Sequence, residues 1–123
     1  MQYMLLIYND ERAWAELPAE ERGAIVQEYF ALTDEFRAAG AYVAGAPLRP
    51  TDTASTIRVR DDQALVTDGP FAETKEQLGG YFLIEADSDD EAREWAAKIP
   101  AARFGSVEVR PVLPVGAEAP TGR

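Results

Sequence analysis

The sequence predicts an α+β domain of the ferredoxin-like type, in which two helices cover one face of an antiparallel sheet. Once one hairpin is set aside, strand-like and helix-like stretches follow each other in the order β-α-β-β-α-β. The two stretches that are apolar on both alternating sets are the first and third main strands, which lie in the centre of this topology. The chain of 123 residues, 46% of them hydrophobic, fits one domain with a compact core.

The first part of the chain predicts a strand and two helices. Gln2–Tyr8 is apolar on both alternating sets, as expected of a buried strand. Asn9-Asp10 can turn the chain and cap a short helix over Glu11–Glu16. A longer helix is expected from Ala19 to Ala39, since Gly40 suits the position just after a helix end. The apolar stripe of that helix consists of Ile25, Tyr29, Leu32 and Phe36, widened by Val26 and Phe30.

A hairpin is inserted after the second main strand. Ala41–Leu48 can form that strand. Ser55–Arg60 alternates strictly between apolar and polar residues, Asp61-Asp62 can turn the chain, and Gln63–Thr67 returns. Together these features predict a hairpin over residues 54–67.

The second half supplies a strand, a helix and a last strand. A polar loop over Asp68–Gly80 leads into an apolar strand over Tyr81–Ala86. The glycine pair Gly79-Gly80 indicates a bulge or a close approach of strands. An S-x-x-E capping box then opens a helix that ends at Pro100. Ser106–Val112 alternates and predicts the final strand.

The domain is expected to span residues 1–113, followed by a flexible tail over residues 114–123 that is rich in proline, glycine and alanine. The chain has no cysteine and no histidine, which excludes disulfides, thiol catalysis and the commonest general base and metal ligand. A net charge of -10 argues against nucleic acid and anionic membranes as partners. No signal peptide or membrane span is recognisable, so we expect a cytoplasmic location.

Two helices can cover only one face of a four-stranded sheet. The other face would expose tyrosine, leucine, phenylalanine and isoleucine side chains, a larger apolar patch than soluble monomers normally carry. A second copy packed sheet to sheet would cover it, so we expect a two-fold homodimer. The alternative is a monomer whose hairpin and tail fold over that face.

The run DGPFAETKEQLGGYFLIEADSDDEAREWAAKIP, the opening QYMLLIY and the ending GSVEVRPV together resemble the YCII-related (YciI-like) DGPF family. The hallmark string DGPFAETKE stands unbroken at Asp68–Glu76, and the resemblance covers about residues 1–113. It implies a dimeric α/β barrel of ferredoxin-like chains. It also implies bacterial cytosolic proteins, often encoded beside sigma factors of the extracytoplasmic-function type. It implies no defined reaction.

The chain departs from the family pattern at two places. Some relatives carry a histidine–aspartate pair proposed as catalytic, but this chain has no histidine, so only Asp68 corresponds to an acidic family position. Similar proteins often place a serine before the proline that precedes the long helix. Here Leu17 stands before Pro18, so the start of that helix lacks the hydroxyl cap.

The polar loop carries the candidate chemistry. Asp68 is a candidate general base if the loop lines a pocket, where partial burial raises the pKa of a carboxyl group. Its other interpretation is an Asx-type turn, in which the carboxylate accepts backbone N–H groups. Glu73 and Lys75 can present an acid and an ammonium group to a small polar ligand, or they can belong to a solvated charged loop.

Further candidates lie outside the loop. Arg58 on the polar face of the hairpin can bind an anion or form cross-strand pairs. Tyr8 and Tyr81 can place hydroxyl groups at the rim of a pocket. No spacing of carboxylates indicates a metal site, and we expect no cofactor.

Two functions fit these residues. In the first, a cofactor-free enzyme uses Asp68 to move a proton on a small cyclic or carbonyl compound, in a pocket between the sheet and a partner chain. Isomerase, dehydratase or lyase chemistry would suit such a site. In the second, a non-catalytic module binds a small ligand or another protein and is linked to sigma-factor or stress regulation.

Overall fold

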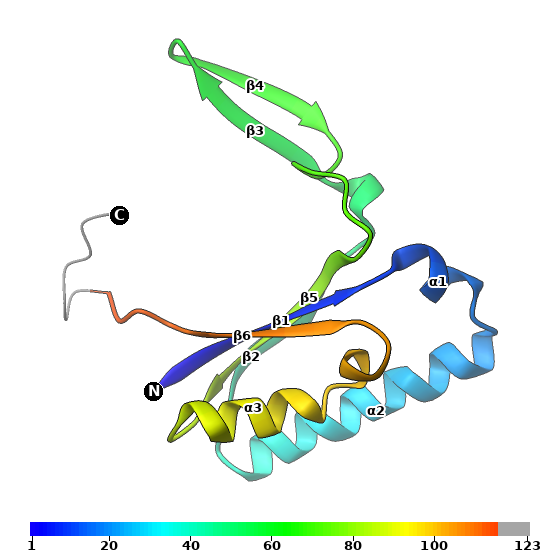
Figure 1. Cartoon of the computed structure of the whole chain (residues 1–123), viewed down its shortest axis with the longest axis vertical. Helices are drawn as coiled ribbons and strands as arrows, with labels where there is room; N and C mark the ends of the chain where they lie inside the picture. The colour runs from blue at the N-terminus through cyan, green and yellow to red at the C-terminus, as the bar shows by residue number, and fades with distance from the viewer. Residues whose placement is uncertain (116–123) are drawn as a thin grey trace.

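The structure, a computed structural model, describes residues 1–115 and contains two separate β-sheets (Figure 1). In chain order the elements are β1 (Gln2–Asn9), α1 (Glu11–Glu16), α2 (Ala19–Ala38), β2 (Tyr42–Pro47), η1 (Thr51–Thr53), β3 (Ser55–Arg60), β4 (Gln63–Asp68), β5 (Gln77–Glu85), α3 (Asp89–Ala97), η2 (Pro100–Arg103) and β6 (Ser106–Pro111). None of the helices in this part of the chain has the length and apolar character that a membrane crossing requires.

The main sheet has the strand order β2-β5-β1-β6, and all of its neighbouring strands are antiparallel. β1 and β5 lie in the centre, as the ferredoxin-like prediction requires. α2 and α3 both lie on one face of this sheet (Figure 1). The predicted fold class is therefore confirmed, including the hairpin between the second and third main strands.

The core lies between the main sheet and the two helices. Side chains of β1 alternate, so that Tyr3, Leu5 and Ile7 are 7% exposed or less while their neighbours are half-buried. Phe36 of α2 is fully buried, and its ring centroid lies 5.0 Å from that of Phe82. The side chains on one face of β1 and β5 therefore pack against the apolar stripe of α2 in a single layer.

The helix ends follow the predicted chemistry. The Asp10 carboxylate accepts N–H groups of the first turn of α1, and the Ser88 hydroxyl accepts one from the first turn of α3. Gly40 has a φ of 71° just after α2, where a side chain would be strained. α2 begins at Ala19 as predicted, although Pro18 before it provides no side-chain cap.

Only part of the predicted α2 stripe is buried. Leu32 and Phe36 are buried, and Tyr29 is half-buried. Val26 and Phe30 are 39% and 61% exposed, so the prediction that they widen the buried face is wrong. The reason is that this side of α2 borders a cavity instead of the sheet.

β5 begins earlier than predicted. The strand starts at Gln77, four residues before Tyr81, because the glycine pair lies inside the ladder. A register shift between β1 and β5 leaves Gly79 without a paired residue. A Cβ atom on Gly80 would lie 3.0 Å from the carbonyl oxygen of Ala46 on β2. The predicted bulge and close strand approach are therefore both present.

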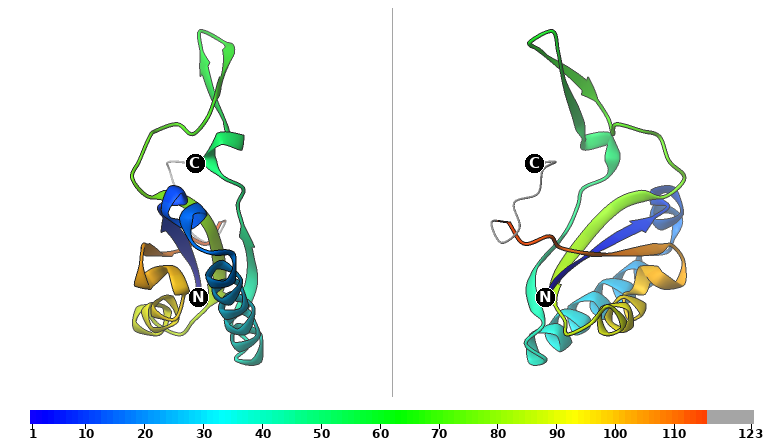
Figure 2. Two further views of the ribbon diagram at one scale, coloured as in Figure 1. Left: turned by 90° about the vertical axis from the view of Figure 1, so that its right-hand side faces the viewer. Right: turned by 60° about the vertical axis from the view of Figure 1, so that its left-hand side comes forward.

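The second sheet is the hairpin β3–β4. Its turn residues Asp61 and Asp62 have φ values of 52° and 62°, as tight hairpin turns require. The hairpin projects from one end of the main sheet, on the side opposite α2 and α3 (Figures 1 and 2). Most of its residues are exposed, so it does not fold over the uncovered sheet face of its own chain. Most of the predicted tail, residues 116–123, lies outside the described residues.

Candidate functional site

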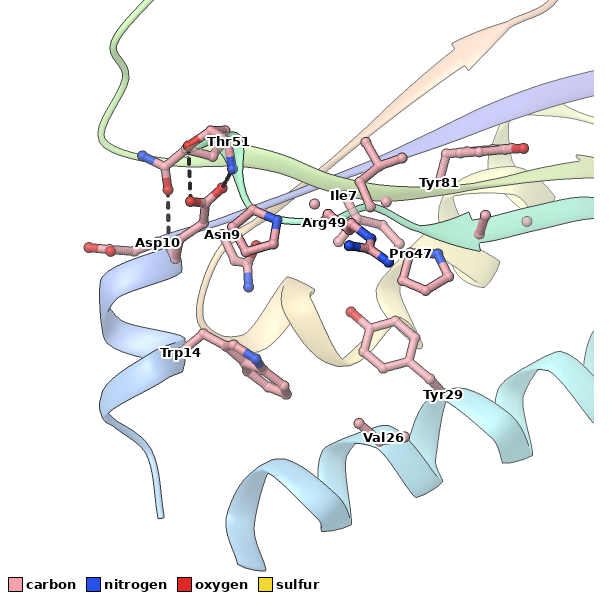
Figure 3. Close-up of a pocket in the computed structure, with 18 of the residues that line it drawn as sticks. Ile7, Asn9, Asp10, Trp14, Val26, Tyr29, Pro47, Arg49, Thr51 and Tyr81 are labelled. Atoms are coloured by element: carbon pink, nitrogen blue, oxygen red, sulfur yellow. Dashed lines mark hydrogen bonds between the residues drawn. The ribbon is translucent and has the colours of Figure 1, made fainter. Parts of the chain in front are cut away.

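A cavity of about 1300 Å³ lies between α1, α2 and the segment that connects β2 to the hairpin. Its volume exceeds the ~300–1,000 Å³ of most small-molecule pockets, because the cavity is a groove that is partly open to solvent. Figure 3 shows Trp14, Val26 and Tyr29 around this space, contributed by α1 and α2. The apolar part of its lining includes Trp14, Val26, Tyr29, Phe30, Leu48 and Phe104.

Glu11 connects the walls of the cavity. Its carboxylate accepts the backbone N–H of Thr51 at 2.8 Å and the hydroxyl of Thr51 at 3.0 Å (Figure 3). Its own N–H donates to the side-chain oxygen of Gln77 at 2.9 Å. Gln77 in turn donates to the carbonyl of Thr74. The start of α1, the start of β5 and the segment before the hairpin are therefore held together.

Positive groups border the cavity without carboxylate partners. Arg12, Arg49 and Lys75 line it, and none of them forms an ion pair within residues 1–115. Arg37 also lines it, but its guanidinium lies 3.9 Å from the Asp34 carboxylate. The cavity thus combines an apolar wall with cationic groups that form no ion pair in this part of the chain, and carboxylates line it as well: Asp10, Glu11, Asp34, Asp52 and Glu73.

Tyr29 places a phenol in the wall of the cavity. Burial raises the pKa of this hydroxyl above its usual value, while the backbone of Ala101 and the charge of Arg103 oppose the shift. The phenol therefore stays neutral near pH 7. In Figure 3 its hydroxyl points across the cavity toward the segment that carries Pro47 and Arg49.

The sequence-predicted site residues divide into two groups. Glu73 and Lys75 line the cavity, in the return segment between the hairpin and β5. Tyr81 also contributes to the lining, but its ring points away from the other labelled residues in Figure 3. Asp68 and Arg58 belong to the hairpin and do not line the cavity.

Asp68 is the last residue of β4, and it is exposed. Its register partner is Ser55 at the base of the hairpin. Within residues 1–115 its carboxylate accepts no hydrogen bond, so the Asx-type turn is not formed there. In the single chain Asp68 is thus neither a turn residue nor part of the cavity.

Tyr8 lies on the sheet face that the helices leave open. Its hydroxyl donates to the Glu108 carboxylate at 3.4 Å, and Glu108 also pairs with Arg110. All three side chains project from neighbouring positions of β1 and β6. This polar group is separate from the cavity.

Sequence reasoning missed the residues that shape the cavity. Glu11 and Thr51 lie 40 positions apart, so no local pattern indicates their contact. Arg49 had a weak signal, a cation just after a main strand and before Pro50. Trp14 and Tyr29 were indistinguishable from core residues. Within the described residues, no group of three His, Cys, Asp or Glu side chains is placed to hold a metal ion.

Comparisons with known proteins agree with this fold. The sequence model of the YCII-related domain matches residues 1–116. An uncharacterized protein of Rhizobium meliloti (strain 1021) is 40% identical over 114 residues, covering 91% of this chain and 92% of the relative.

One solved structure with a similar fold is 5-chloro-2-hydroxyhydroquinone dehydrochlorinase from Burkholderia phenoliruptrix AC1100, in complex with 2,5-dihydroxybenzoquinone. It superposes with a TM-score of 0.54 at 16% identity, over 92% of this chain and 94% of that one.

Proposed function

This chain belongs to the YCII-related domain family, and from that premise we propose that it acts as a homodimer on a small cyclic anion. The ligand binds in the cavity beside α1 and α2, and a carboxylate of the protein moves a proton without a cofactor. One observation supports this proposal above all. Apolar side chains and cationic groups without ion-pair partners among the described residues line the same groove.

The ligand class follows from the lining. Trp14 and Tyr29 offer flat apolar surfaces to a ring, and Arg49 and Lys75 offer positive charge to a carboxylate or an acidic hydroxyl group. A structural neighbour with this fold holds a dihydroxyquinone, which has both features. A planar ring with acidic oxygen atoms is therefore the ligand class that suits the cavity.

The reaction is a proton transfer on carbon. A carboxylate removes a proton from the carbon next to a carbonyl group, the negative charge moves to the carbonyl oxygen, and a nearby cation stabilises it. Among the site residues that the sequence predicts, Glu73 is the carboxylate that lines the cavity. Lys75, two positions further along the chain, is the cation. Asp68 remains the second candidate base, and it requires a partner chain to reach an enclosed site.

Binding can be measured through Trp14, with Trp95→Phe as the background because Trp95 lies against the core. Addition of 2,5-dihydroxybenzoquinone should change the Trp14 fluorescence. Arg49→Gln should weaken binding about tenfold or more, as expected for a lost charge-assisted contact. Arg60→Gln is the matched control, because Arg60 lies at the hairpin tip and donates to the carbonyl of Val59. Equal affinities of the two variants would contradict the proposed site.

The candidate bases are separated by Glu73→Gln and Asp68→Asn, assayed with cyclic 1,2- and 1,3-dicarbonyl compounds in deuterated water. Loss of the deuterium incorporation that exceeds the uncatalysed rate, at unchanged affinity, identifies the base. An excess over the uncatalysed rate that survives both substitutions would contradict carboxylate catalysis.

The second candidate is a non-catalytic module that binds a small ligand or a protein. The exposed apolar hairpin favours it, since such surfaces serve as docking sites. Ligand binding with no proton exchange in the wild-type protein would support this candidate over the enzyme.

A further inference from the structure

The hairpin β3–β4 is amphipathic, although none of its apolar residues is buried. Residues directly opposite each other in an antiparallel pair lie on the same face. The register pairs Ile57 with Val66 and Val59 with Ala64, which places all four on one face. Ile57, Val59 and Val66 of this face are 56%, 60% and 66% exposed. The opposite face carries Thr56, Arg58, Arg60, Gln63, Leu65 and Thr67.

Nothing in the described part of the chain covers the apolar hairpin face. The hairpin stands away from the main sheet in every view (Figures 1 and 2). An isolated two-stranded hairpin is only marginally stable in water, because it has no layer to pack against. This hairpin therefore needs a partner surface to bury its apolar residues.

The open face of the main sheet needs cover as well. Its side chains Met4, Leu6, Tyr81 and Leu83 are half-buried, and no helix lies over them. The hairpin rises on this same side of the sheet, at one end (Figure 1). The sheet face and the hairpin thus form the two sides of a concave angle.

We propose that this angle holds a second copy of the chain, and that the hairpin of each copy clasps the other through Ile57, Val59 and Val66. This inference rests on the homodimer of the proposed function and adds the hairpin contact as part of its interface. A two-fold interface must be self-complementary, and both surfaces that lack cover belong to the same chain.

The size of the interface supports the clasp. A sheet of four strands about six residues long has a flat area of about 400 Å², from the strand spacing and rise. A stable interface usually buries about 800 Å² per partner. The sheet face alone is therefore small for a stable dimer, and the hairpin extends it.

Charge also favours a second copy. The chain carries a net charge of -10, so two copies repel each other wherever charged surfaces meet. Ile57, Val59, Ala64 and Val66 carry no charge, and Arg58 and Arg60 lie on the opposite face of the hairpin. This part of the hairpin can therefore pack against a second acidic chain without placing like charges together.

The clasp has a consequence for Asp68. Asp68 pairs with Ser55 at the base of the hairpin, two positions beyond Val66, and therefore on the apolar face. In the clasped dimer this carboxylate lies between the two chains instead of in bulk water. The partner chain then supplies the enclosure that the single chain lacks.

The inference can be tested with introduced thiols, because the chain has no cysteine. Val66→Cys and Thr67→Cys place thiols on opposite faces of the same strand, and Thr67→Cys is the matched control. Their rates of reaction with 5,5′-dithiobis(2-nitrobenzoic acid) are measured over a range of protein concentrations, with light scattering for the mass. We expect Val66→Cys to react about tenfold more slowly than Thr67→Cys in the dimer, and equally fast after dilution to monomer.

Each other outcome has a separate meaning. Equal rates in a proven dimer would overturn the clasp and leave the homodimer standing. A monomer at tens of micromolar would overturn both. Protection of Val66→Cys that does not change on dilution would show that the hairpin packs on its own chain, and it too would overturn the clasp. Val59→Cys repeats the measurement at a second position, in case Val66→Cys weakens the dimer.

Discussion

The central strand β1 and the hairpin strand β3 both carry an apolar face, and the two faces differ in burial. β1 alternates Tyr3, Leu5 and Ile7 with other residues, and these three side chains are buried. β3 alternates Ile57 and Val59 with polar residues, yet both are more than half exposed. Alternation therefore specifies a strand with an apolar face. It does not specify what covers that face.

The covering layer makes the difference. Phe36 from α2 reaches the sheet and contacts the rings of Phe82 and Trp95, with centroid distances of 5.0 and 4.7 Å. Main-chain contacts of the hairpin are mainly those between its own two strands. Between the main sheet and its two helices, burial is completed within one chain. For the apolar face of the hairpin, we infer that a second chain completes it.

The largest effect on stability should come from replacing a buried phenylalanine by alanine, and the same replacement at an exposed phenylalanine near the hairpin is the comparison. Phe36→Ala should lower the free energy of unfolding by about 3–5 kcal/mol, the usual cost of deleting a buried aromatic ring. Phe71, in the segment after the hairpin, is 80% exposed. Phe71→Ala in the monomer should change stability by less than about 0.5 kcal/mol. Urea unfolding at low protein concentration measures both. Similar losses would mean that the exposed region carries a core of its own.

A smaller effect is expected at the junction between body and hairpin. Glu11→Ala removes the acceptor for both groups of Thr51. The loss should be about 1.5–3 kcal/mol, as for hydrogen bonds to a charged group. Amide exchange around Thr51 should also accelerate, which mass spectrometry detects. Glu20→Ala is the matched control, because Glu20 also lies in a first helix turn and is exposed. Unchanged exchange in Glu11→Ala would show that Glu11 does not hold this junction.

The fold could be predicted because its signals are local. Periodicity placed every main strand, Asp10 and Ser88 placed the starts of α1 and α3, and Gly40 placed the end of α2. The glycine pair at Gly79 indicated the bulge. Each of these features depends on neighbours a few positions away, which a sequence displays directly.

The site could be predicted only in part, because it depends on distant contacts. Glu73 and Lys75 were found through the charged loop that contains them. The exposure of Val26 and Phe30 could not be predicted, because the apolar stripe on α2 does not indicate which of its sides packs on the sheet. The surroundings of Asp68 depend on how the hairpin packs, which we propose is decided by a second chain.

The smallest effect compares two glycines of the main sheet and its covering helix. Gly23 lies within α2, where an added Cβ atom would have no atom within 4 Å. Gly23→Ala should therefore raise the unfolding free energy by about 0.5–1 kcal/mol, because alanine loses less backbone entropy in a helix. Gly45→Ala in β2 should instead destabilise, since its Cβ atom would lie 2.7 Å from the ring of Phe82. Thermal unfolding of the two variants measures opposite shifts in Tm. Two shifts of the same sign would mean that backbone entropy, and not the space around each glycine, controls stability in both elements.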